Sequence, residues 1–94
     1  MLGGKRSDVA ITLDILRLVR KGERKTRIMY GANLSYDMLT RYIDFLTDRG
    51  FIETDGSDTL YKLTGKGTLL AQDLERVNRH FDLPADDLPT ARVR

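Results

Sequence analysis

The chain has 94 residues, of which 40% are hydrophobic and 32% are charged, proportions that are typical of one small globular domain. It contains no cysteine and a single histidine, so disulfides, thiolate zinc sites, iron–sulfur clusters and histidine-based metal sites are excluded. The formal net charge is only +2, but residues 1–30 carry +5 and residues 31–94 carry −3, so the distribution of charge is more informative than its sum.

The first third of the chain predicts two helices. Ser7 is a suitable N-cap, and the apolar residues after it recur at helical spacing, which predicts a helix over residues 8–20. A shorter helix is predicted next, with Thr26 as its N-cap and its end at Gly31. The apolar stripe of the first helix consists of Val9, Ile11, Ile15, Leu16, Leu18 and Val19.

A third helix, over residues 35–49, has the clearest signals. Ser35 is its N-cap, Leu34 and Leu39 are spaced to pack across its first turn, and Gly50 ends it. Its apolar stripe faces the core, so a polar side is left for contacts with another molecule. That side consists of Tyr36, Asp37, Thr40, Arg41, Asp44, Thr47 and Asp48.

A β-hairpin is predicted over residues 51–63, because β-prone segments flank the turn sequence Asp55-Gly56-Ser57-Asp58. Thr64 then caps a last helix over residues 65–82, which cannot continue through Pro84.

We expect one domain over residues 1–82 and a mobile tail over residues 83–94. The order helix, short helix, turn, helix, hairpin, helix is that of a winged helix-turn-helix. The predicted fold class is therefore α+β, mainly α, with a two- or three-stranded wing and an additional C-terminal helix.

Several runs of residues at fixed spacings link the chain to a known family. They are Asp14-Ile15-Leu16, Lys25-Thr26-Arg27-Ile28-Met29-Tyr30, Asn33-Leu34-Ser35, Tyr42, Leu46, Gly50-Phe51-Ile52 and Tyr61-Lys62-Leu63-Thr64-Gly65-Lys66-Gly67. In these residues the chain resembles the archaeal winged-helix family of small DNA-binding proteins and predicted transcriptional regulators. Known members are dimers that bind double-stranded DNA, and some pair through an antiparallel coiled coil of their C-terminal helices. The resemblance implies that residues 35–49 are a recognition helix in the major groove and that residues 51–63 are the wing.

Eight polar or basic side chains are candidate DNA contacts. They are Arg24, Lys25, Arg27, Ser35, Tyr36, Thr40, Arg41 and Lys62. The first three surround the start of the short second helix, where basic groups and free backbone N–H groups favour phosphate. Arg41 is suited to the guanine edge, although it is also spaced to pair with Asp37 on the helix surface.

Four apolar residues of the last helix predict a dimer interface, with spacings of four, three and four residues. They are Leu70, Leu74, Val77 and Phe81. A monomer seldom exposes such a stripe, and pairing of two helices would bury it. In the alternative interpretation, Leu70 and Leu74 belong to the domain core and only the other two are exposed.

We expect a double-stranded DNA-binding transcriptional regulator or nucleoid-associated protein, acting as a homodimer. The alternative is a winged-helix module that binds a protein partner without DNA, which the aspartates of the third helix and of the wing favour. No catalytic arrangement, cofactor, metal, small-molecule ligand or membrane segment is evident in the sequence. We therefore expect a cytoplasmic, nucleoid-associated protein that is not an enzyme.

Overall fold

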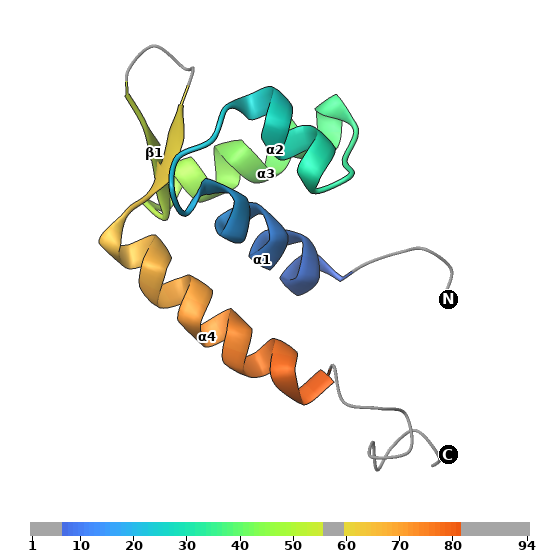
Figure 1. Cartoon of the computed structure of the whole chain (residues 1–94), viewed down its shortest axis with the longest axis vertical. Coiled ribbons are helices and arrows are strands. Elements are labelled where there is room, and N and C mark those ends of the chain that lie inside the picture. The colour runs from blue at the N-terminus through green and yellow to red at the C-terminus, as the bar shows by residue number, and fades with distance from the viewer. Residues whose placement is uncertain (1–6, 56–59, 82–94) are drawn as a thin grey trace.

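The computed structural model describes residues 7–55 and 60–81 of the chain. Its elements are α1 (Asp8–Val19), α2 (Lys25–Gly31), α3 (Tyr36–Asp48), β1 (Ile52–Thr54), β2 (Tyr61–Leu63) and α4 (Gly65–Phe81) (Figure 1). This order confirms the mainly helical winged-helix prediction. The predicted turn residues 56–58 and the predicted tail at residues 83–94 lie outside the described residues. No described helix is long and apolar enough to cross a membrane.

α1 is the central helix of the domain and packs on two sides. α2 and β2 cover one side, and α4 lies along the other (Figure 1). Leu13, which the predicted apolar stripe left out, is therefore only 1% exposed, whereas Val9, which the stripe included, is 39% exposed. Leu13 stands one helical turn before Arg17, and Arg17 pairs with Glu75 of α4, so Leu13 faces the α4 side. The predicted apolar stripe assumed that α1 is covered on one side only, so it did not include a residue that faces a second neighbour.

The core is one cluster of apolar side chains between the helices and the hairpin. Every element contributes at least one buried residue to it, and a fully buried aliphatic side chain stabilises a domain by about 1.5–3 kcal/mol. α2 contributes one buried side chain, Ile28, and the partly buried Met29, so this short helix is attached to the core through two neighbouring residues. The other buried members include Ile15, Leu16, Val19, Leu39, Ile43, Leu46, Ile52, Tyr61 and Ala71.

The predicted starts of α1 and α3 and the predicted end of α3 are confirmed. Ser7 Oγ accepts a hydrogen bond from the N–H of Ala10 at 3.1 Å, and Ser35 Oγ accepts one from the N–H of Met38 at 3.2 Å. Each serine thus satisfies one of the N–H groups that a helix start leaves without a helical partner. Gly50, after α3, has a φ of +80°, the left-handed conformation expected where a helix ends at glycine.

The prediction that Thr26 caps α2 is wrong, because α2 begins at Lys25 and Arg24 holds the cap position without a side-chain hydrogen bond. The reason lies in the segment before it. Glu23 pairs with Tyr61 through two backbone hydrogen bonds of 2.9 and 2.8 Å, so the chain stays extended up to Arg24. The helix starts directly after this bridge.

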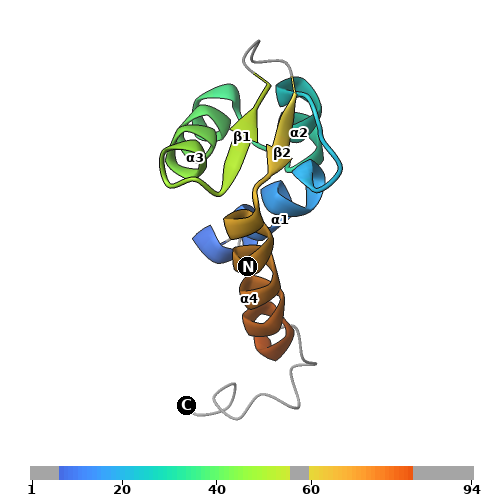
Figure 2. The ribbon, with the colours of Figure 1, turned by 90° about the vertical axis from the view of Figure 1, so that its left-hand side faces the viewer.

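The wing is a two-stranded antiparallel sheet, in which Ile52 lies opposite Leu63 and Glu53 opposite Lys62. The bridge from Glu23 adds a third backbone segment at its edge, which falls between the two- and three-stranded forms that were predicted. Figure 2 shows the two strands between α3 and α2, with α4 running away from them. The wing and the three helices thus form one body from which α4 extends.

Thr64 and Lys66 tie the start of α4 to the end of α3 through two hydrogen bonds. Thr64 caps α4 as predicted, since its Oγ1 accepts from the N–H of Gly67 at 2.9 Å. The same hydroxyl donates to the carbonyl oxygen of Gly50 at 2.6 Å. Lys66 Nζ donates to the carbonyl oxygen of Arg49 at 2.7 Å, so the last carbonyls after α3 are occupied by groups at the base of α4.

Further along α4, Glu75 anchors the helix to α1. Arg17 donates to it through Nε at 2.8 Å and Nη2 at 2.7 Å, a two-point contact that fixes the geometry of both side chains. These hydrogen bonds hold the pKa of Glu75 below its ordinary value; partial burial opposes the shift, and the positive charges of Arg17, Arg20 and Arg79 reinforce it.

We predict that Gly67→Ala destabilises the domain by about 1–3 kcal/mol, as expected for an overpacked contact. A Cβ at Gly67 would overlap the carbonyl oxygen of Phe51, which is backbone and cannot rotate away. Gly65→Ala is the matched control, because a Cβ there meets nothing within 4 Å and alanine favours the helix. Urea unfolding of both variants measures the difference. Equal stability of the two variants would contradict this account of the joint.

We predict that Glu75→Gln lowers the free energy of unfolding at pH 7 by about 0.5–1 kcal/mol, the value of a partly exposed pair with good geometry. The pKa of Glu75 is lower in the folded protein than its unfolded value of about 4.3. The stabilisation is therefore complete above that pH and is lost as the pH falls through the folded pKa. Thermal unfolding of both proteins between about pH 7 and pH 3 checks this. A difference that is absent at pH 7, or that grows on acidification, would refute the prediction.

Candidate nucleic-acid interface

α3 is held by one side and exposes the other. Leu39, Ile43 and Leu46 are buried in the core, which confirms the predicted orientation of the helix. The opposite surface carries three carboxylates and one guanidinium. These exposed charged residues are Asp37, Arg41, Asp44 and Asp48. No ion pair joins Arg41 to Asp37 in the described part of the chain, so the arginine remains available to another molecule.

The placement of Thr40 on the outward face is wrong. Its Oγ1 is buried and has no hydrogen-bond partner among the described residues. Thr40 stands one turn before Ile43, at the margin of the buried stripe, so packing covers its hydroxyl instead of presenting it. A contact of this hydroxyl with DNA is not supported.

Tyr36, at the start of α3, connects it to the start of α2. Its hydroxyl accepts a hydrogen bond from Lys25 Nζ at 3.4 Å, and the same ammonium lies 4.9 Å from the ring centroid. Ser35, next to it, is exposed, but its hydroxyl is engaged as the helix cap. Lys25 and Tyr36 therefore form one exposed polar surface that joins the two helices.

Around Lys25 the predicted cluster of basic side chains is present on the surface. Arg24 is exposed and its guanidinium has no ion-pair partner among the described residues. Arg27 Nε lies 3.6 Å from Glu23 Oε2, but the arginine side chain is largely exposed. Glu23 is the one acid between residues 20 and 27, so it leaves an excess of positive charge here. We call Arg24, Lys25 and Arg27 the α2 basic cluster.

Lys62 of the wing has acidic neighbours. It lies directly opposite Glu53 in the sheet, and both side chains line a surface hollow together with Asp55. Carboxylates so close to an ammonium reduce its attraction for phosphate. These acidic neighbours distinguish Lys62 from the α2 basic cluster.

Tyr30 was not selected from the sequence, yet it is 74% exposed on α2. It follows Arg27 by three residues, so the two side chains share one side of the short helix. The spacing of three residues between Arg27 and Tyr30 is the sequence signal that could have placed Tyr30 beside the basic side chains. An exposed tyrosine next to basic groups is suited to contact a sugar or phosphate of nucleic acid.

The predicted dimer row is divided between core and surface. Leu70 and Leu74 are partly buried and pack against the domain core, as the alternative interpretation states. Val77 is 42% exposed, and the side chain of Phe81 lies outside the described part of the structure. The two leucines are partly covered because α4 packs along α1 before it extends beyond it.

Known proteins share this sequence pattern. The sequence model of the winged helix-turn-helix family matches residues 5–81 of this chain. Two uncharacterized proteins of Methanocaldococcus jannaschii are similar to it. MJ0290 is 44% identical over 77 residues, which make up 80% of this chain but only 35% of that protein, so the chain spans about a third of its relative. MJ0287 is 41% identical over 71 residues, 74% of this chain and 71% of that protein.

Two solved structures share the fold. The crystal structure of Sso10a-2, a DNA-binding protein from Sulfolobus solfataricus, matches 79% of this chain and 80% of its own, with a TM-score of 0.70 and 33% identity. The MarR family transcriptional regulator SPO1453 from Silicibacter pomeroyi DSS-3 matches 92% of this chain and 68% of its own, with a TM-score of 0.61. At 22% identity, the second likeness concerns the fold alone.

Proposed function

Because this chain belongs to the winged helix-turn-helix family, we propose that it binds double-stranded DNA as a transcriptional regulator or a nucleoid-associated protein of the cytoplasm. The observation that carries the proposal is the continuous surface formed by the α2 basic cluster and the start of α3, which Lys25 and Tyr36 join. The likeness to Sso10a-2, a DNA-binding protein at 33% identity, supports the same assignment. Retention of the chain by random-sequence duplex at low salt is the direct test.

In this proposal the two helices have different tasks. An exposed α-helix fits a major groove about 12 Å wide, so α3 would enter it with its N-terminal half foremost. The α2 basic cluster would then lie against the phosphates beside the groove and fix the position of the protein. Arg41 is the side chain proposed to reach a base edge.

The aspartates of α3 and the acidic wing limit how DNA approaches. Asp44 and Asp48 lie toward the C-terminal end of α3, and Glu53 and Asp55 lie in the wing. All four repel phosphate. We therefore propose that the duplex lies nearer to α2 than to the wing, and that Lys62 contributes little.

These same carboxylates favour a second candidate function, a winged-helix module that binds a protein partner without DNA. α3 would then present its charged surface to complementary groups on that partner. Absence of duplex binding at low salt, together with a folded chain, would favour this candidate.

We further propose that the chain forms a homodimer through the exposed flank of α4. Val77 is exposed on this flank, and the partly buried Leu70 and Leu74 stand at helical spacing from it on the side toward the domain. Pairing with a second copy would remove the exposed part of this row from water.

We predict that replacing Arg24, Lys25 and Arg27 together by alanine weakens binding to every duplex sequence alike, because phosphate contacts carry no sequence information. Each lost phosphate contact reduces the slope of log K against log salt by about 0.9, or about 2.7 for all three. Fluorescence anisotropy at several salt concentrations measures the slope. The control replaces Arg76 and Arg79 of α4 by alanine and should leave the slope unchanged. An unaltered slope in the triple variant would remove the cluster from the interface.

We predict that Arg41→Ala costs about 1–3 kcal/mol on a preferred duplex and much less on random sequence, as expected when a contact to a base edge is lost. A selection from random duplexes supplies the preferred site. Lys62→Ala is the comparison and should have the smaller effect, since acidic groups surround it. Equal losses on both duplexes would assign Arg41 a backbone contact.

We predict that Val77→Glu weakens the dimer by about tenfold or more, because a buried carboxylate without a partner is costly. Leu69→Glu is the matched control, since Leu69 is 63% exposed on another side of α4. Leu74 is a poorer choice because it also packs against the core. Sedimentation equilibrium measures the association. A wild-type chain that sediments as a folded monomer at micromolar concentration would rule out this interface.

A further inference from the structure

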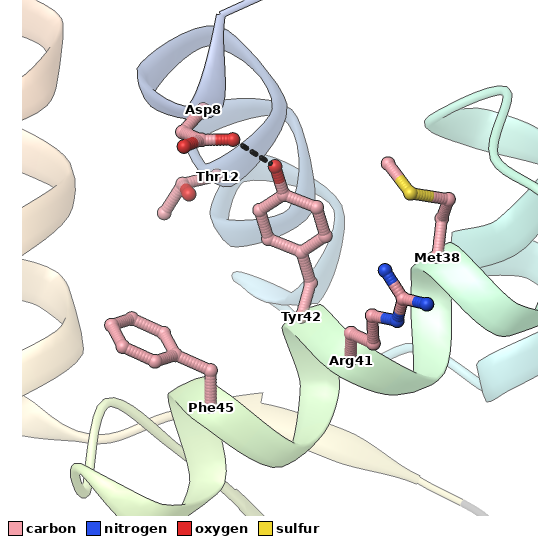
Figure 3. Close-up of a pocket in the computed structure, with 6 residues that line it drawn as sticks. All are labelled: Asp8, Thr12, Met38, Arg41, Tyr42 and Phe45. Carbon is pink, nitrogen blue, oxygen red and sulfur yellow. Dashed lines mark hydrogen bonds between the residues drawn. The ribbon is translucent and has the colours of Figure 1, made fainter.

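A surface hollow of about 370 Å³ lies between the start of α1 and one side of α3, where no sequence pattern predicts one. Volumes of about 300–1,000 Å³ are usual for small-molecule sites. Figure 3 shows the side chains around it, which come from α1 and α3, with Tyr42 directed toward Asp8. They are Asp8, Thr12, Met38, Arg41, Tyr42 and Phe45.

The walls of this hollow suit a flat apolar group. Met38 and Phe45 are both exposed although they are large and apolar, and the ring of Tyr42 stands between them along α3 (Figure 3). A thioether and aromatic rings make favourable contacts with another aromatic ring. An aromatic ligand placed here would cover side chains that otherwise face water.

The polar groups of the hollow are fixed at one end. Asp8 Oδ1 accepts a hydrogen bond of 2.6 Å from the hydroxyl of Tyr42, 34 residues away in the sequence. The other carboxylate oxygen of Asp8 has no partner among the described residues. It is therefore an acceptor held in place and ready for a donor from a ligand.

Among the residues that line the hollow, Arg41 supplies a positive charge. Its guanidinium forms no ion pair in the part of the chain that the structure describes. A planar guanidinium binds a carboxylate through two parallel hydrogen bonds. The hollow thus combines apolar walls, one cation and one fixed acceptor.

We propose that this hollow binds a small aromatic acid that has a hydrogen-bond donor at the end opposite its carboxylate. The ring lies against Met38 and Phe45, the carboxylate binds Arg41, and the donor binds the second oxygen of Asp8. The negative charge of Asp8 disfavours an acid that lacks the donor, so the site discriminates between the two kinds of acid.

A regulatory consequence follows, which rests on the proposed DNA-binding function. Arg41 is also the side chain proposed to reach a base edge, and one guanidinium cannot serve a ligand carboxylate and a base together. Occupation of the hollow therefore lowers the affinity for a preferred duplex. Binding in the hollow itself does not depend on DNA.

The test titrates the full, DNA-free chain with 4-hydroxybenzoate and follows backbone amide signals by NMR. We expect saturable shifts confined to residues that line the hollow, and weaker binding of benzoate and of 4-hydroxybenzyl alcohol, which lack the donor and the carboxylate. Shifts that do not saturate, or that concentrate on another surface, would overturn the proposal.

Variants separate the two polar contacts. Arg41→Gln should weaken 4-hydroxybenzoate by about tenfold, whereas Arg41→Lys should restore part of the affinity. Arg79→Gln, an exposed arginine of α4, is the control and should bind as the wild type does. Asp8→Asn should weaken 4-hydroxybenzoate but not benzoate, since only the first ligand has a donor. An Asp8→Asn variant that weakens both ligands equally would refute the assigned orientation.

A duplex-binding assay with and without 4-hydroxybenzoate completes the experiment. The ligand should weaken binding of the wild type to a preferred duplex and leave Arg41→Gln unaffected. A chain that binds the ligand but no duplex would support the site and reject the proposed function. A chain that binds duplex but shows no saturable ligand shifts would reject the site and leave the proposed function standing.

Discussion

The packing of α1 on both of its sides is the constraint on which the rest of the domain depends. A chain of this size has room for one core, and α1 supplies more of it than any other described helix. Through one side it holds the helix-turn-helix, and through the other it holds α4, with Arg17 and Glu75 fixing their relative position. The exposed surface of α3 and the direction of α4 are therefore set by the same helix.

Positive and negative charges are distributed unevenly over the surface of the domain. The basic excess of the first third of the sequence is concentrated around α2, whereas the exposed side of α3 and the wing are acidic. Electrostatics therefore distinguishes the two regions: the surface of α2 attracts phosphate, and the wing attracts it little.

The sequence was sufficient where local chemistry decides the structure. Ser7, Ser35 and Thr64 cap their helices as predicted, because a cap depends on a few neighbouring residues.

The sequence was insufficient where distant segments meet. The start of α2 depends on a backbone bridge between residues 23 and 61, and the burial of Leu13 depends on α4. The hollow beside α3 depends on the angle between two helices, which no periodicity reveals. Thr40 could be assigned to a helix from its spacing, but not to the covered margin of that helix.

The joint at the base of α4 connects this helix rigidly to the end of α3. The hydroxyl of Thr64 and the ammonium of Lys66 are bonded to the carbonyls that directly follow α3, and Gly67 lets the two segments touch. α4 extends for 17 residues, or about 25 Å at 1.5 Å per residue. The Arg17–Glu75 pair holds the helix a second time, so only residues 76–81, about 9 Å at 1.5 Å per residue, extend beyond this contact. A force on that end would therefore be shared between α1 and the end of α3.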